Sequence, residues 1–313
     1  MRAPGIYANH TRLFELVERR APIVKVAGGF GRLTGPLFSR IGYLLFSDSR
    51  GGRIRRWTNP PPWGDESVRG KLTTDRICSG EPQGITFDHQ GRLLMCERNP
   101  GRVVRLEKDG ITTVLAETYR GRRLGAPDDL VYNIDGSIFF SAAPAPQSFR
   151  VRPRGDRQEA AAMTRPAVYR IPRSQIPGPI RLERASGECG RPTGVALGPR
   201  QNRLYVADAR QRNIRSHPIR DDGTLEQGRV FAEFPSQDPG IPGGLKTDEQ
   251  GHLYASGPGG LWVFSPDGAH LGTIVTPEPP TNCGWGRGFR GLYITTGSSL
   301  YFVGTRVPGT RTY

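Results

Sequence analysis

A unit made of a turn, a short apolar strand, a second turn and an outer strand recurs along nearly the whole 313-residue chain. Repetition at a fixed period indicates a repeat architecture, in which each unit buries its apolar face against its neighbours. The copies begin at Gly35, Gln83, Asp128, Thr193, Gly243 and Cys283. They lie roughly 40 to 50 residues apart, with one longer interval, as expected for four-stranded propeller blades. We therefore predict an all-β, six-bladed β-propeller with four-stranded blades.

Composition agrees with many short strands. The chain holds 42 Gly and 28 Pro, together more than a fifth of its residues. These residues favour tight turns and leave little room for long helices. We expect one propeller over residues 24–305, after a leader at 1–23 and before a C-terminal tail at 306–313.

Two segments depart from the blade pattern. In the leader, residues 11–20 place Leu13, Phe14, Leu16 and Val17 on one stripe after Thr11, which predicts a short helix packed outside the propeller. The longer interval, between the third and fourth copies, contains residues 142–167. This insertion is rich in Pro, Arg and Ala and lacks strand alternation, so it is either a lid over one face, which we favour, or a disordered excursion.

Charge and cysteine spacing bear on compartment and partners. Residues 1–10 contain no apolar signal core, and no later run is long enough to cross a bilayer, so we expect a soluble cytoplasmic protein without a membrane partner. The four cysteines are far apart and predict reduced thiols. The net charge of +15 favours anions, but the Arg clusters at 53–56 and 120–123 lack interleaved aromatic residues. We therefore expect no nucleic-acid partner; the oligomeric state stays open.

Equivalent residues at the starts of the six innermost strands converge on the mouth of a propeller channel. Aligning the copies puts at that position Thr34, Gln83, Asp128, Thr193, Gly243 and Asn282. Thr, Asn and Asp are also common turn residues, so the shared register carries more weight than any single member. None of the five histidines falls in this ring, which argues against a Ser-His-Asp or metal-histidine site.

Five further stretches match one family in order and spacing. They are GYLLFSD from Gly42, GRLLMCE from Gly91, RLGAPDDLV from Arg123, LYVAD from Leu204 and GPGGLWVFSPDGAHLGTI from Gly257. With these stretches the chain resembles, over roughly residues 24 to 305, the family of gluconolactonase, regucalcin (senescence marker protein) and luciferin-regenerating enzyme. The resemblance implies a propeller that binds one divalent cation, commonly calcium, at the channel mouth and opens lactone rings.

The resemblance also implies metal ligands, and here the sequence departs from the family pattern. The positions of the usual Glu, two Asn and Asp ligands carry Thr34, Asp128, Thr193 and Gly243. Calcium takes six to eight oxygens with carboxylates prominent among them, and this set offers one carboxylate and a residue with no side chain. We therefore expect the family's metal ligands to be replaced and no cofactor to be needed, with a divalent cation such as calcium as the alternative.

The remaining polar residues suggest chemistry without a metal. Asp128 and the adjacent Asp129 are the candidate catalytic carboxylates. Asp129 could equally hold its turn in place through hydrogen bonds to the backbone. The expected substrate-binding residues are Thr34, Gln83, Arg98, Thr193, Asn282 and Trp285. Arg98 follows a Cys-Glu pair where many relatives have His, and it could hold a carboxylate or polarise a carbonyl. Trp285 could form an aromatic wall or belong to the core.

We therefore expect an enzyme acting on a small molecule, anionic or carbonyl-bearing, by metal-independent acid/base chemistry. Ring-opening of a lactone or ester, a cyclisation and an isomerisation all fit these residues. Two alternatives stay open: a calcium-dependent lactonase whose site is rebuilt from Asp128, Asp129, carbonyls and water, and a non-catalytic small-molecule binding protein. The sequence names neither the substrate nor its pathway.

Overall fold

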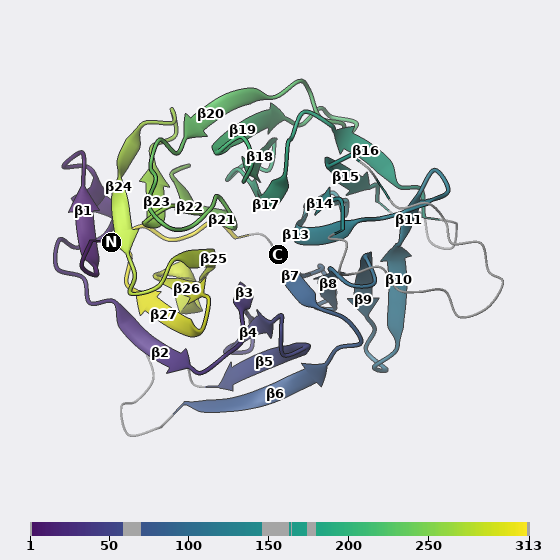
Figure 1. Ribbon diagram of the computed structural model, residues 1–313, viewed down its shortest axis with the longest axis horizontal. Coiled ribbons are helices and arrows are strands. Elements are labelled where there is room, and N and C mark those ends of the chain that lie inside the picture. Colours follow the sequence, from purple (N-terminus) through teal and green to yellow (C-terminus); the bar gives the residue numbers. More distant parts are fainter. Residues whose placement is uncertain (1, 59–69, 146–162, 164, 174–179, 312–313) are drawn as a thin grey trace.

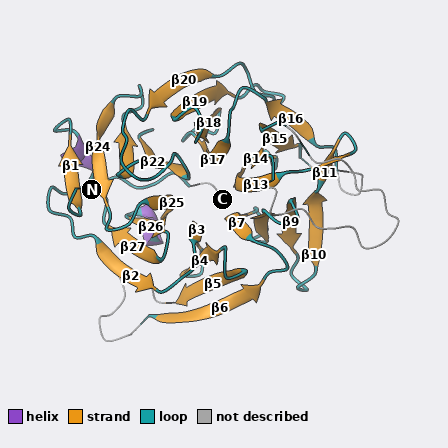
Figure 2. Ribbon diagram, in the orientation of Figure 1, coloured by secondary structure: helices purple, strands orange, loops and turns teal. Residues whose placement is uncertain are grey.

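In the computed structural model, six antiparallel sheets surround a central channel, so the predicted six-bladed, all-β propeller is confirmed (Figures 1 and 2). The structure describes residues 2–58, 70–145, 163, 165–173 and 180–311. The first strand of each repeat copy lies nearest the channel, and each following strand lies farther out (Figure 1).

Blades one to four each take their four strands from one continuous stretch of chain. Blade one contains β3 (Leu33–Phe38), β4 (Tyr43–Asp48), β5 (Arg53–Thr58) and β6 (Lys71–Ile77). Blade two contains β7 (Pro82–Phe87), β8 (Leu93–Glu97), β9 (Arg102–Leu106) and β10 (Thr112–Ala116). Blade three contains β13 (Ala126–Tyr132), β14 (Ile138–Ala143), β15 (Ala167–Ile171) and β16 (Glu183–Ser186). Blade four contains β17 (Pro192–Leu197), β18 (Arg203–Asp208), β19 (Asn213–Pro218) and β20 (Arg229–Glu233). A hairpin of β11 (Thr118–Tyr119) and β12 (Arg122–Arg123) joins blades two and three.

The N-terminal leader adds a strand to blade five, and the strand after it completes blade six. Blade five contains β21 (Leu245–Thr247), β22 (Leu253–Gly257), β23 (Gly260–Phe264), β24 (His270–Val275) and, as a fifth outer strand, β1 (Gly5–Ala8). Blade six contains β25 (Pro280–Trp285), β26 (Leu292–Thr296), β27 (Ser299–Val303) and, as its outer strand, β2 (Val24–Gly28), with a short 3-10 helix at Arg287–Phe289. The pairing of β2 with β27 closes the ring between the first and last blades.

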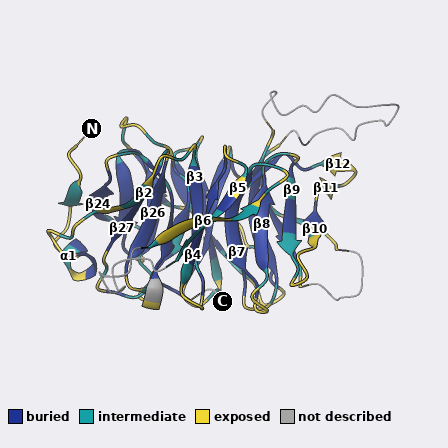
Figure 3. Ribbon diagram, turned by 90° about the horizontal axis from the view of Figure 1, so that it is seen from below, coloured by how far each residue is buried: buried dark blue, intermediate teal, exposed yellow. Residues whose placement is uncertain are grey.

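Burial decreases from the channel outward and explains the apolar pattern of the inner strands. Every residue of β17 is buried, whereas β6 at the outer edge of blade one has no buried residue. Inner strands pack against neighbouring blades on both faces and therefore read as continuous apolar runs. Figure 3 shows this buried core across the thickness of the disc.

The leader contains a helix of one turn, α1 (Leu13–Leu16), shorter than the expected 11–20. Leu13, Leu16 and Val17 are buried in a cluster with residues of blades five and six. At the other terminus, Thr310 is buried and its hydroxyl donates to the Asp248 carbonyl at 2.8 Å. Both terminal segments therefore contribute to the packed propeller.

Most of the insertion at 142–167, namely 146–162 and 164, lies outside the described residues, and with it the expected lid. Met163 is described; it is buried, and its N–H donates to the Arg123 carbonyl at 3.0 Å. All four cysteines are free thiols. Across the described parts of the chain, no helix has the length and apolar composition needed to cross a membrane.

Candidate active site

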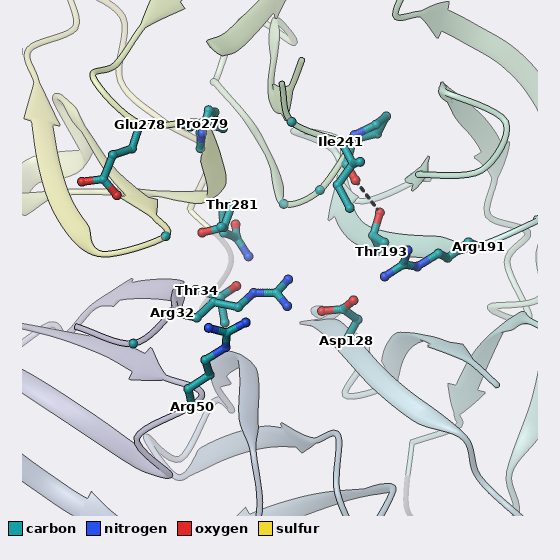
Figure 4. Close-up of a pocket in the computed structure, with 18 residues that line it drawn as sticks. Arg32, Thr34, Arg50, Asp128, Arg191, Thr193, Ile241, Glu278, Pro279 and Thr281 are labelled. Atoms are coloured by element: carbon teal, nitrogen blue, oxygen red, sulfur yellow. Dashed lines mark hydrogen bonds between the residues drawn. The ribbon is translucent and has the colours of Figure 1, made fainter. Parts of the chain in front are cut away.

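A cavity of about 430 Å³ opens at the mouth of the channel where the inner strands begin (Figure 4). It is lined by five of the six ring residues expected from the sequence: Thr34, Asp128, Thr193, Gly243 and Asn282. Its size suits a small molecule rather than a polymer. A second cavity of about 620 Å³ adjoins it, since Asp128 and Arg191 line both.

Irregularities in the inner strands position the ring residues. The strand register shifts between Pro127 and Leu130 in β13, and between Pro192 and Gly194 in β17. The same irregularity lies at the start of β3, β7 and β25. A β-bulge re-aims the side chains of its residues. At this end of five blades it places Asp128 and its counterparts around the channel mouth.

Asp128 is held by an ion pair with Arg98. The Arg98 Nη2 donates to the Asp128 Oδ2 at 3.0 Å, and the two side chains are 11% and 19% exposed. Arg98 follows β8 directly, and its own N–H donates to the Glu81 carbonyl, which fixes the backbone from which it reaches. A partly buried, charge-assisted pair of this kind fixes the carboxylate and leaves its remaining lone pairs toward the cavity.

The uncharged ring residues are tied to the neighbouring loops. Thr193 Oγ1 donates to the Pro242 carbonyl at 2.8 Å, and Asn282 Oδ1 accepts from the Cys283 N–H at 2.7 Å. A Cβ at Gly244 would lie 1.8 Å from Asn282 Oδ1, so this glycine leaves room for the amide. The cavity wall is thus preorganised by contacts between blades four, five and six.

Of the predicted site residues, Arg98 lines only the adjoining cavity, and three others line neither of the two. Trp285 lies at the opposite end of β25, where its Nε1 donates to the Thr247 carbonyl at 2.9 Å and its ring packs edge-to-face on Tyr254. It lines a separate cavity of about 40 Å³ with Thr310. Gln83 is fully buried, and its Nε2 donates to the Ser49 hydroxyl. Strand length and the bulge geometry separate these side chains from the mouth.

Asp129, the third, faces away from the cavity and between blades. Its carboxylate accepts from the backbone N–H groups of Leu130 at 3.1 Å and Val195 at 3.3 Å, which links blade three to blade four. Burial is the main cause that raises its pKa to about 6, and the Lys246 charge and these hydrogen bonds oppose the rise. These hydrogen bonds agree with the bracing role that the sequence left as the alternative for Asp129.

Arginines near Asp128 were missed by the sequence reasoning. Arg32, Arg50 and Arg191 line the main cavity, and Arg210 lines the adjoining one beside Arg98, which the sequence had indicated. Burial chiefly, followed by the charge of Arg98, lowers the pKa of Arg32; Asp128 opposes this effect. A signal existed in the repeat: RLTG at 32–35 and RPTG at 191–194 place Arg two residues before the ring threonine in blades one and four.

Glu278 is the second carboxylate in the cavity wall. It accepts hydrogen bonds from Ser298, Ser299 and Thr296. Burial would raise its pKa, but these hydrogen bonds outweigh that effect and lower it. In Figure 4 its carboxylate points away from Asp128 and the arginines.

The donor set does not suit a divalent cation. The two carboxylates in the main cavity wall are separately engaged, Asp128 by a guanidinium and Glu278 by hydroxyl and amide groups. Among the residues that the structure describes, no group of three or more His, Cys, Asp or Glu side chains is placed to hold a metal. A hard cation needs several oxygens free of competing cations, and guanidinium groups repel it.

The structure is thus a six-bladed propeller with a polar cavity at the mouth of its channel. The chain belongs to the SMP-30/gluconolactonase/LRE-like family, whose model matches residues 34–298. It is 26% identical over 316 residues to a gluconolactonase of Zymomonas mobilis subsp. mobilis, covering 95% of this chain and 85% of that protein.

Solved structures agree with this assignment. A gluconolactonase from Xanthomonas campestris is 27% identical, with a TM-score of 0.80 over 97% of this chain and 96% of its own. A calcium-binding regucalcin from Agrobacterium tumefaciens is 13% identical, with a TM-score of 0.68 over 93% of this chain and 98% of its own. The likeness to the regucalcin shows a shared fold alone.

Proposed function

We propose that the protein is a hydrolase that opens a small lactone or ester ring in the cavity at the channel mouth, by acid/base chemistry that needs no divalent cation. The observation that carries the proposal is the ion pair of Asp128 with Arg98 at the junction of the two cavities. Membership of the lactonase family and the name of the Zymomonas relative support a lactone as substrate.

The proposed reaction uses Asp128 as the proton-transfer group. Water adds to the lactone carbonyl carbon while Asp128 takes a proton from that water. The ring C–O bond then breaks, and the leaving oxygen takes the proton back, so that lactone and water become a hydroxy acid and Asp128 is regenerated. Arg98 keeps the carboxylate oriented.

Positive charge near Asp128 supports the second requirement of ester cleavage, stabilisation of the oxyanion that forms on the carbonyl oxygen. Arg98 and Arg32 are the candidates, since the charges of Arg98 and Asp128 both act on the Arg32 guanidinium. In the family pattern that this sequence resembles, a metal ion supplies this charge. Here we assign it to guanidinium groups.

Chelation tests the proposal. Purified protein would be assayed for hydrolysis of a panel of five- and six-membered lactones, before and after dialysis against a chelator. We expect turnover and melting temperature to stay unchanged and no stoichiometric metal by elemental analysis. Loss of activity that calcium or another divalent ion restores would instead establish a metal-dependent lactonase, and absence of turnover on every lactone would overturn the hydrolase.

A further inference from the structure

The arginines around Asp128 approach it from two sides of the cavity. Arg32 and Arg50 come from the two loops at the mouth of blade one, and Arg191 comes from the loop before β17 in blade four. In Figure 4 the guanidinium groups of Arg32 and Arg191 lie on either side of the Asp128 carboxylate and face the open space in front of it.

Within the described chain these arginines lack carboxylate partners. Asp128 is within ion-pair distance of Arg98, and no described carboxylate oxygen lies within 4.0 Å of a guanidinium nitrogen of Arg32, Arg50 or Arg191. The walls of the two cavities hold five arginines, Arg98 and Arg210 included, and two carboxylates, Asp128 and Glu278, which leaves a balance of three positive charges. The charges of Arg98, Arg191 and Arg50 add to burial in lowering the pKa of Arg32, which reports their mutual repulsion.

Like charges held around one cavity repel one another, and an anion bound between them would relieve that repulsion. Arginine presents a planar fork of donors that matches the two oxygens of a carboxylate or the face of a phosphate. Some arginines elsewhere in the chain are paired with carboxylates: Arg92 with Asp88 and Glu107, and Arg215 with Glu188. What distinguishes Arg32, Arg50 and Arg191 is that all three line one cavity.

We infer that the substrate carries an oxyanion group, a carboxylate or a phosphate, which Arg32, Arg50 and Arg191 bind while its reacting carbonyl lies beside Asp128 and Arg98. This inference rests on the proposed function for the identity of the reacting group. The anion site itself depends only on the arginines. The occupant is small, because the cavity measures about 430 Å³.

Calorimetric binding tests the anion site without requiring turnover. The probes are gluconate, glucose 6-phosphate and glucose, which carry a carboxylate, a phosphate and no charge. We expect at least one anion to bind about tenfold or more tightly than glucose. Tighter binding of gluconate identifies a carboxylate site, and tighter binding of glucose 6-phosphate a phosphate site. Equal binding of all three probes would overturn the inference.

Matched variants separate the site from the general positive charge of the protein. Arg32→Gln and Arg191→Gln remove one charge each within the cavity, and Arg200→Gln removes one from an exposed turn at the other end of blade four. We expect the first two to weaken anion binding about tenfold and Arg200→Gln to leave it within about twofold. Equal effects of all three variants would show nonspecific attraction and sink the site.

The same variants distinguish the two proposals. Intact, arginine-dependent anion binding in a protein that hydrolyses no lactone would overturn the hydrolase alone. Hydrolysis of an uncharged lactone with kcat/KM at least equal to that of its carboxylated or phosphorylated analogue, and unchanged in Arg191→Gln, would overturn the anion site alone. Melting temperatures of each variant verify folding.

Discussion

Asp128 and Asp129 are neighbours in the sequence with different environments, because the bulge in β13 turns their side chains apart. Asp128 faces the cavity and pairs with Arg98, while Asp129 is buried and accepts backbone hydrogen bonds from two blades. Exposure to the cavity suits Asp128 to contact a ligand. The backbone partners of Asp129 suit it to a structural role.

Replacing Asp128 with Asn tests the catalytic assignment. The amide keeps the shape of the side chain and can still accept from Arg98, but it cannot take a proton. We expect normal folding and a fall in kcat of about a hundredfold or more. Steady-state kinetics would be compared with Asp129→Asn, for which we expect a change of only a few-fold. Near-normal turnover in Asp128→Asn would remove Asp128 from the mechanism.

The raised pKa of Asp129 leads us to predict that the stability of the protein depends on pH. Burial raises its pKa from 3.8 to about 6, so between these values the folded protein keeps a proton that the unfolded chain releases. The free energy of unfolding therefore falls as pH rises from about 4 to about 6, by on the order of 2 to 3 kcal/mol, and this contribution is constant above.

Urea unfolding of wild type and Asp129→Asn, at several pH values from about 4 to about 7, measures this effect. Groups other than Asp129 titrate in both proteins and cancel in the difference. We expect the stability of wild type relative to the variant to fall across this range. Parallel curves would show that Asp129 does not keep its proton in the folded state.

At the scale of elements, the leader adds a fifth strand to blade five, and the strand after it completes blade six. β1 pairs with β24 in blade five, and β2 pairs with β27 in blade six. Because β2 belongs to the start of the chain and β27 to its end, this pairing fastens the ring. The apolar side of α1 then packs over blades five and six.

Leu13→Ala tests whether the leader is part of the core. Leu13 is fully buried, so truncation leaves a cavity and should lower the free energy of unfolding by about 2 to 5 kcal/mol. Phe14, next to it, is only partly buried and stacks under Arg19, so Phe14→Ala should cost about 1 kcal/mol or less. Chemical denaturation compares the two, and equal small losses would show that the leader packs only loosely.

At the scale of the whole molecule, the net charge of +15 and the arginines at the channel mouth act in the same direction. A positive field focused by a cavity raises the local concentration of an anionic substrate and its association rate. We therefore expect the net positive charge to speed the capture of an anionic substrate.

Ionic strength tests this long-range effect. Raising it from about 0.01 M to about 1 M shortens the Debye length from about 30 Å to about 3 Å. We expect kcat/KM for a carboxylated or phosphorylated lactone to fall about tenfold or more, and that for an uncharged lactone to change little. Assaying both substrates across the same salt series gives the comparison. Identical salt slopes would contradict steering by the mouth arginines.

The sequence by itself predicted the six blades, because each inner strand shows its burial locally as an apolar run between turns. The same register also identified Thr34, Asp128, Thr193, Gly243 and Asn282, which the structure brings to one cavity. Equivalent positions in a repeat occupy equivalent places around the ring, so this much follows from local spacing. The arginines before the ring threonines were present in the same repeat and could have been found there.

Tertiary structure alone decided the rest. A bulge reverses which side a residue faces, so alternation could not show that Asp129 and Gln83 are buried behind the wall. Trp285 and Asn282 share one strand, but that strand crosses the disc and separates them. The charge cluster and the pairing of β2 with β27 depend on ring closure, which brings together residues remote in sequence, and no local pattern records that contact.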